Sequence, residues 1–191
     1  MMELIKILVD SILSQNIALV FILGMCPLIA ISNNLKNAFW MGIAVVFVVT
    51  LTAAINYPIY QLLLKTNTTN LALLIFIITI AATVQFLEMF LEKFFPTLYN
   101  AFGIFLPLIT VNCVVLAISL FFVNRNYNFG ETVVYSFGSG LGWMLAIILL
   151  AGLRERLKER NDIPRGLKGK GIAFIILGIL ALAFIGFTGL I

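Results

Sequence analysis

Two stretches of the sequence decide its fold: CPLIAIS at residues 26–32 and CVVLAIS at residues 113–119. Four of the seven positions are identical in the two stretches, and a fifth exchanges isoleucine for leucine. They also hold both cysteines of the chain, each near the middle of an apolar segment. The chain therefore contains an internal repeat, and the segments around each copy indicate how the two halves are arranged.

The composition indicates which solvent surrounds the folded chain. Of the 191 residues 62% are hydrophobic and only 10% are charged, and the mean hydropathy is +1.14. A soluble domain usually carries about 25% charged residues, and it could not bury this much apolar surface in water. The sequence therefore predicts an all-α integral membrane protein in a lipid bilayer rather than a soluble domain.

The apolar segments give the number of membrane crossings. A helix needs about 20 apolar residues to cross a hydrocarbon core of about 30 Å. The first segment is short, since its fully apolar part covers only residues 17–31 and polar side chains precede it. The other segments are long enough to span: 37–64, 71–91, 101–123, 132–153 and 171–191. We therefore expect six transmembrane helices.

Both cysteine-bearing segments contain residues that disrupt helices. Pro27 lies in the first segment, and Pro107 and Asn112 lie in the fourth. Proline removes a backbone donor and clashes with the preceding turn, so helices 1 and 4 are expected to break near mid-membrane. The two copies lie three segments apart, in the first and the fourth, and because three is odd they cross the bilayer in opposite directions. This pattern is typical of two inverted three-helix repeats, here residues 1–92 and 93–191.

The positive charges predict the orientation. Seven of the twelve Lys and Arg residues lie in the loop 154–170, which the positive-inside rule places in the cytoplasm. With six crossings, both termini then face the outside. These cations indicate a determinant of topology rather than a surface for nucleic acid. The chain has no histidine, so the commonest general base and metal ligand is absent.

The two cysteines, Cys26 and Cys113, allow three interpretations. They can be small apolar core residues, which free cysteine suits well. They can form a disulfide, although mid-bilayer offers no obvious route to an oxidant. They can also bind metal as thiolates, supplying half of the four cysteines that hold an iron–sulfur cluster or a structural zinc, with the rest from another subunit. These residues alone leave the choice open.

Four motifs resemble the NqrDE/RnfAE family: LGMCP at 23–27, GIFLPLITVNC at 103–113, GLRERL at 152–157 and GFTGL at 186–190. The resemblance covers essentially the whole chain. It implies a six-helix subunit of the Rnf complex, which passes electrons from ferredoxin to NAD⁺, or of the Na⁺-translocating NADH:quinone oxidoreductase. The short loop 65–70 favours the A subunit of Rnf, and GSGLGW at 138–143 favours the E subunit of the quinone enzyme. The Rnf type is preferred, and the quinone-enzyme type is second.

The resemblance also implies a cofactor and partners. In the family, two paralogous subunits of opposite orientation each supply two cysteines to a shared [2Fe–2S] cluster. Carried onto this chain, the ligands are Cys26 and Cys113, while Gly24, Pro27, Pro107 and Asn112 shape the helix breaks. Further subunits with flavin and iron–sulfur centres, and a location in the prokaryotic inner membrane, are implied as well.

The leading hypothesis is an electron-carrying subunit of a complex that exports Na⁺ or H⁺. Reduction of the cluster in a medium of low dielectric constant would favour a different packing of the broken helices and open a cation path on one side. The alternative is a secondary transporter or channel with inverted repeats, in which the cysteines only pack. A third hypothesis is a structural assembly subunit without a redox group.

Overall fold

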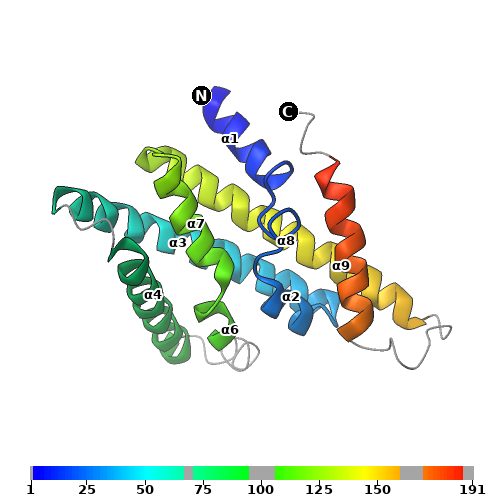
Figure 1. Cartoon of the computed structure of the whole chain (residues 1–191). Coiled ribbons are helices and arrows are strands. Elements are labelled where there is room, and N and C mark those ends of the chain that lie inside the picture. Colours follow the sequence, from blue (N-terminus) through cyan, green and yellow to red (C-terminus); the bar gives the residue numbers. More distant parts are fainter. Residues whose placement is uncertain (1, 67–70, 95–105, 160–169, 187–191) are drawn as a thin grey trace.

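The computed structural model describes residues 2–66, 71–94, 106–159 and 170–186. Within these residues every regular element is a helix, as predicted (Figure 1). Parts of the predicted fourth span, cytoplasmic loop and sixth span (101–105, 160–169 and 187–191) lie outside the described residues. In chain order the helices are α1 (Met2–Ile12), α2 (Met25–Ile31), α3 (Leu35–Lys65), α4 (Ala72–Phe94), α6 (Leu106–Thr110), α7 (Cys113–Asn124), α8 (Phe129–Glu159) and α9 (Lys170–Ile185).

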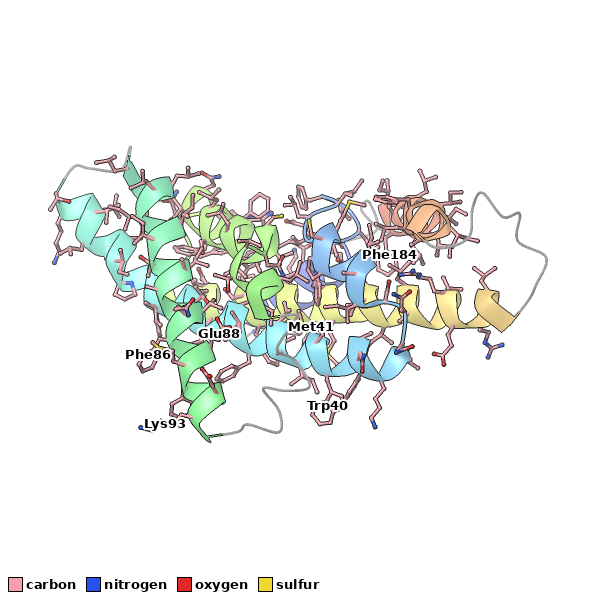
Figure 2. All side chains as sticks on the ribbon, turned by 90° about the horizontal axis from the view of Figure 1, so that it is seen from below. Trp40, Met41, Phe86, Glu88, Lys93 and Phe184 are labelled. Carbon is pink, nitrogen blue, oxygen red and sulfur yellow. The ribbon has the colours of Figure 1, made fainter. Side chains whose placement is uncertain are left out.

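Two long helices, α3 and α8, form the centre of the molecule. Each has 31 residues, which corresponds to about 46 Å at about 1.5 Å per residue. They run side by side in opposite directions (Figures 1 and 2). On α3, Met41 is fully buried, whereas Trp40 beside it points away from the bundle (Figure 2). The other helices pack around this pair.

Glycines let α8 approach its neighbours closely. A Cβ atom at Gly138 would lie 2.1 Å from Ser11 Oγ, and one at Gly142 would lie 3.2 Å from the Ser11 carbonyl oxygen. A Cβ atom at Gly140 would lie 3.0 Å from the Cα atom of Val46 on α3. Small residues permit such close packing between membrane helices. The glycine stripe of α8 therefore has a packing role toward both α1 and α3.

The two cysteine-bearing segments are interrupted, as predicted. The first consists of α1 and α2, and the second consists of α6 and α7. In Figure 1 the first descends from the N-terminus while the second rises, so they run in opposite directions. Backbone outside a helix is tolerated at membrane depth only where protein covers it. Ile17, Ala18 and Leu19 in the first interruption are at most 1% exposed, and Asn112 in the second is 3% exposed.

An aromatic cluster joins α4 and α7 to the C-terminal part of α3. The ring centroids of Tyr60 and Phe122 lie 6.2 Å apart, and Phe76 lies 6.3 Å from Tyr60 and 6.0 Å from Phe122. Phe76 and Phe122 are almost completely buried. Aromatic pairs at this spacing stabilise a core beyond the area that they bury. This cluster lies away from the two cysteines on α2 and the first turn of α7.

Long apolar helices support an integral membrane protein. Among the residues that the structure describes, three helices are long and apolar enough to cross a bilayer, Leu35–Lys65, Ala72–Phe90 and Phe129–Leu157. Two shorter apolar helices there are Leu108–Asn124 and Gly171–Ile185. Only 17% of the apolar window of α4 is buried. Figure 2 shows α4 projecting past α3, with Phe86 and Lys93 on its outer side. Such exposed apolar surface is stable in lipid and unfavourable in water.

The two halves share one order of elements. Each has an interrupted pair of short helices, then a helix of 31 residues, then a single shorter helix. The last helices of the halves differ in direction, since α9 is seen end-on in Figure 2 and α4 from the side. The halves therefore match in the interrupted segments and in the long helices, and they differ in the direction of their last helix.

Candidate functional site

The first interruption is organised by the side chain of Asn16. Its Nδ2 atom donates to the carbonyl oxygens of Ile12 at 3.0 Å and Gly142 at 2.9 Å. Its Oδ1 atom accepts from the backbone N–H groups of Ala18 at 3.0 Å and Leu19 at 3.3 Å. Asn16 is completely buried, and both polar atoms of its side chain have partners. It therefore ends α1 and supports the backbone that continues toward α2.

The chain enters α2 through unusual backbone conformations. Ile22 has φ 56° and Gly24 has φ 76°, both in the left-handed region. Glycine adopts this region freely, whereas a β-branched residue is strained there. The apolar stretch 17–31 is therefore not one helix, and only Met25–Ile31 is helical. Pro27 does not make the break, because it lies in the first turn of α2, where a missing N–H group costs little.

The second interruption is shorter and is capped in a regular way. It consists of Val111 and Asn112, and the Asn112 side chain accepts a hydrogen bond from the Val114 N–H at 3.1 Å. Asparagine is among the best N-cap residues for this reason. Cys113 is the first residue of α7. Pro107 is the second residue of α6, four residues before the break, so it too occupies a first helical turn.

The N-terminal ends of α2 and α7 lie against each other. A Cβ atom at Gly24 would lie 2.4 Å from Val114 Cγ2 and 3.1 Å from Asn112 Oδ1. Cys26 follows Gly24 by two residues, and Cys113 lies between Asn112 and Val114. The fold therefore brings the two cysteine-bearing helix starts together, although they are far apart in the sequence.

Both cysteines are free thiols with exposed side chains. The two cysteines are therefore not core residues of this chain by itself, and they do not form a disulfide with each other. Exposed apolar side chains surround them in the sequence: Phe21 and Ile22 before Cys26, and Val111, which is 75% exposed, before Cys113. A face of this kind is accessible to lipid or to another membrane protein.

The two thiols at this face could supply half of the ligands of a four-cysteine metal cluster. Within the described residues, no three His, Cys, Asp or Glu side chains gather, so a metal cluster bound by these two thiols would need further ligands from elsewhere. Helix N-termini favour negative charge, which suits thiolates bound to iron. The Nδ2 atom of Asn112 is a buried donor without a partner, and hydrogen bonds to cluster sulfur are a known use for such donors.

Two serines show contacts that the sequence did not predict: Ser32, which follows the last residue of α2, and Ser119, in the middle of α7. Ser32 accepts a hydrogen bond from Arg154 Nη1, and Ser119 accepts one from Asn56 Nδ2 at 2.8 Å. Ser32 and Ser119 are the last residues of the two repeated motifs, and their partners belong to the long helix of the opposite half. The repeat of serine at this position was the only sequence signal for these contacts.

A polar cluster fastens α1 to the turn between α7 and α8. Arg125 donates to Gln15 Oε1 and, at 3.0 Å, to the hydroxyl of Tyr127. Gln15 donates to Asp10 Oδ2 at 2.7 Å. The guanidinium of Arg125 also lies 5.5 Å from the ring centre of Tyr135, within cation–π range. Arg125 lies outside the cation-rich loop, and its contacts join the two halves of the chain.

Comparison with known proteins adds a family and a relative. A family model described as "Rnf-Nqr subunit, membrane protein" matches residues 4–191. The E subunit of the Na(+)-translocating NADH-quinone reductase from Hahella chejuensis (strain KCTC 2396) is 49% identical over 197 residues, covering 97% of each chain. Both matches agree with the family that the motifs around the cysteines indicated. The name of the relative is that of the quinone-enzyme type, which the sequence motifs placed second to the Rnf type.

Proposed function

The chain belongs to the Rnf-Nqr family of membrane subunits, and on that premise we propose that it carries electrons through a [2Fe–2S] cluster shared with a paralogous subunit. It is a membrane component of an ion-translocating complex of the Rnf or Nqr type. In this proposal Cys26 and Cys113 are two of the four ligands. The paralogue supplies the other two, and the cluster supplies one-electron transfer.

The observation that carries the proposal is the meeting of two helix N-termini with two free, exposed thiols. Gly24 permits the contact, since a side chain there would collide with Val114 and Trp143. A charged thiolate in lipid is costly without a metal. A partner with the same construction would complete the ligand set and cover the exposed apolar residues beside the thiols.

The quinone enzyme is the complex that we propose for this chain. The support is the relative's name together with its 49% identity over nearly the whole of both chains. Na⁺ is the ion in that name, and we carry it over as the ion that the complex exports. The sequence-based preference for Rnf rested on one short loop, of which residues 67–70 lie outside the described part.

The proposal includes the inner membrane and an orientation. Both termini face the outside, and the loop 154–170 faces the cytoplasm, because that loop holds most of the cations. The two inverted repeats, residues 1–92 and 93–191, supply one broken helix each, in six crossings. Alkaline phosphatase fused to the C-terminus should be active, and an inactive fusion would contradict the orientation.

The decisive experiment replaces each cysteine in the purified, intact complex. Cys26→Ser and Cys113→Ser should each abolish the EPR signal of the cluster that the two paralogues share, while signals of other iron–sulfur centres remain. They should also lower the iron content of the complex and stop electron transfer. Val111→Ser is the matched control, because Val111 is more exposed than any other large apolar residue described and precedes Cys113. This variant should keep the signal.

Three results would exclude the proposal. An unchanged cluster signal in Cys113→Ser would remove the assigned ligand. Ion transport that survives in a Cys26→Ala, Cys113→Ala double variant, without any redox partner, would favour the secondary transporter instead. A colourless complex whose electron transfer survives the double replacement would favour a purely structural component.

A further inference from the structure

Arg154 of α8 is buried although its neighbours along the chain are exposed. Only 5% of Arg154 is exposed, whereas Glu155 and Arg156 are exposed residues. Its Nη1 atom donates to the Ile29 carbonyl oxygen at 2.9 Å and to Ser32 Oγ, and its Nη2 atom donates to Asn33 Oδ1 at 2.7 Å. All three acceptors belong to the C-terminal end of α2 or follow it directly.

These hydrogen bonds cap the helix that carries Cys26. The last carbonyl groups of a helix lack partners within the helix, and a cation near them is favourable. The other end of α2 is held by the same long helix, since Trp143 Nε1 donates to the Gly24 carbonyl oxygen at 3.4 Å. Trp143 and Arg154 are 11 residues apart, which is about three helical turns. They therefore lie on one face of α8 and hold both ends of α2.

The charge of Arg154 is not neutralised by these partners. A backbone carbonyl, a hydroxyl and a carboxamide are all neutral acceptors. A buried cation is unfavourable unless an anion compensates for it. The helix between Arg154 and Cys26 is short, because α2 has seven residues, or about 10 Å. Across such a distance in a medium of low dielectric constant, opposite charges still attract strongly.

The second half of the chain makes a neutral contact at the position that matches Ser32. Ser119 stands where Ser32 stands in the repeated motif, and its partner is the carboxamide of Asn56 on α3. Asn56 is fully buried, and its Oδ1 atom has no partner. Each long helix thus contacts the last serine of the other half's repeated motif, at the end of α2 and in the middle of α7, and of these two contacts only the one at α2 is charged.

We propose that Arg154 is a positioning residue for Cys26 whose buried positive charge makes the metal group at the two thiols easier to reduce. The proposal rests on the function proposed above. Arg154 orients α2 through three hydrogen bonds, and its charge favours the more negative, reduced state of the group. A cation that the positive-inside rule counts only toward membrane topology thereby acquires a role in the redox site.

The test measures the midpoint potential of the cluster in the intact complex by EPR-monitored titration. Arg154→Gln removes the charge and should shift the midpoint to a more negative value. Asn33→Asp should shift it in the same direction, because the new carboxylate neutralises Arg154 and keeps the hydrogen bond and the side-chain shape. Since this second variant keeps the hydrogen bond that Arg154 donates, it remains informative if Arg154→Gln assembles poorly.

Two further variants separate charge from position. Arg156→Gln removes an exposed charge two residues further along α8 and should leave the midpoint unchanged. Arg154→Lys keeps the charge but cannot make the same fork of hydrogen bonds, so it should keep the midpoint and lower the iron content. Equal midpoints in wild type, Arg154→Gln and Asn33→Asp would overturn this inference alone. A wild-type complex without the cluster would overturn the proposed function and this inference together.

Discussion

The two helix breaks begin from nearly the same motif and are built in different ways. The first takes twelve residues, 13–24, with two left-handed residues at its end and a buried asparagine that makes four hydrogen bonds. The second takes two residues, 111–112, and one standard cap. Repetition of a motif therefore preserves the position of a cysteine at a helix start, while the backbone that leads to it is free to differ.

The two breaks also differ in which contacts stabilise their backbone. The first break depends on side chains and on contacts with α8, since Asn16 binds Gly142 and Trp143 binds Gly24. The second break is local, because Asn112 caps the helix that follows it in the chain. We therefore expect substitutions at the first break to be more damaging than those at the second.

The largest effect is expected from Gly24→Ala. A Cβ atom there would lie 2.4 Å from Val114 Cγ2 and 2.7 Å from Trp143 Nε1. The left-handed backbone and the overpacking together should cost about 2–5 kcal/mol, seen as a lower midpoint of thermal unfolding of the purified complex. Gly152→Ala is the control, because a Cβ atom at Gly152 would meet nothing within 4 Å. Equal midpoints in the two variants would show that the helix starts are not in contact.

An intermediate effect is expected from the two asparagines, compared with each other. Asn16→Ala removes four hydrogen bonds, two of them to backbone N–H groups, and should cost about 2–3 kcal/mol. Asn112→Ala removes one cap and should cost about 1 kcal/mol. Thermal unfolding of both variants in the same detergent gives the order. If Asn112→Ala were the more damaging, the contrast between the breaks would be reversed.

The smallest effect is expected from glycine at the exposed position before each helix start. Ile22→Gly removes the strain of a β-branched residue in the left-handed region. Glycine loses more conformational entropy on folding, so the net stabilisation should be about 0.5 kcal/mol. Val111 has no positive φ, so Val111→Gly should destabilise by about 0.5–1 kcal/mol. Opposite signs in the unfolding midpoints are the expected result. A loss of stability in both would mean that Ile22 is not strained.

The long helices could be predicted from the sequence because hydrophobic length is a local property. The predicted span 37–64 became Leu35–Lys65, and 132–153 became Phe129–Glu159. The second extends further because Glu131 near its start and the charged residues after Leu153 continue the helix beyond the apolar window. The breaks were also predictable in kind, although the prolines lie just inside helices rather than at the breaks.

The contacts between distant residues could not be predicted in the same way. Arg154 belongs to a run of cations, and nothing in that run distinguishes it from Arg156, which is exposed. It is buried because α2, about 125 positions earlier, ends beside it. Asn16 is similar, since its partner Gly142 lies on the opposite half. Spacing along one helix predicts a shared face, but it does not predict which other helix covers that face.

The exposed thiols also imply an order in which the two paralogues and the cluster are assembled. A copy that has been inserted in the membrane without its partner holds two free thiols at an uncovered apolar face. Under the proposed function, the cluster can form only after both paralogues have met, because each supplies half of its ligands. A bound cluster therefore indicates that the two paralogues have paired correctly. Balanced synthesis of the two proteins would then leave no copy with this apolar face uncovered.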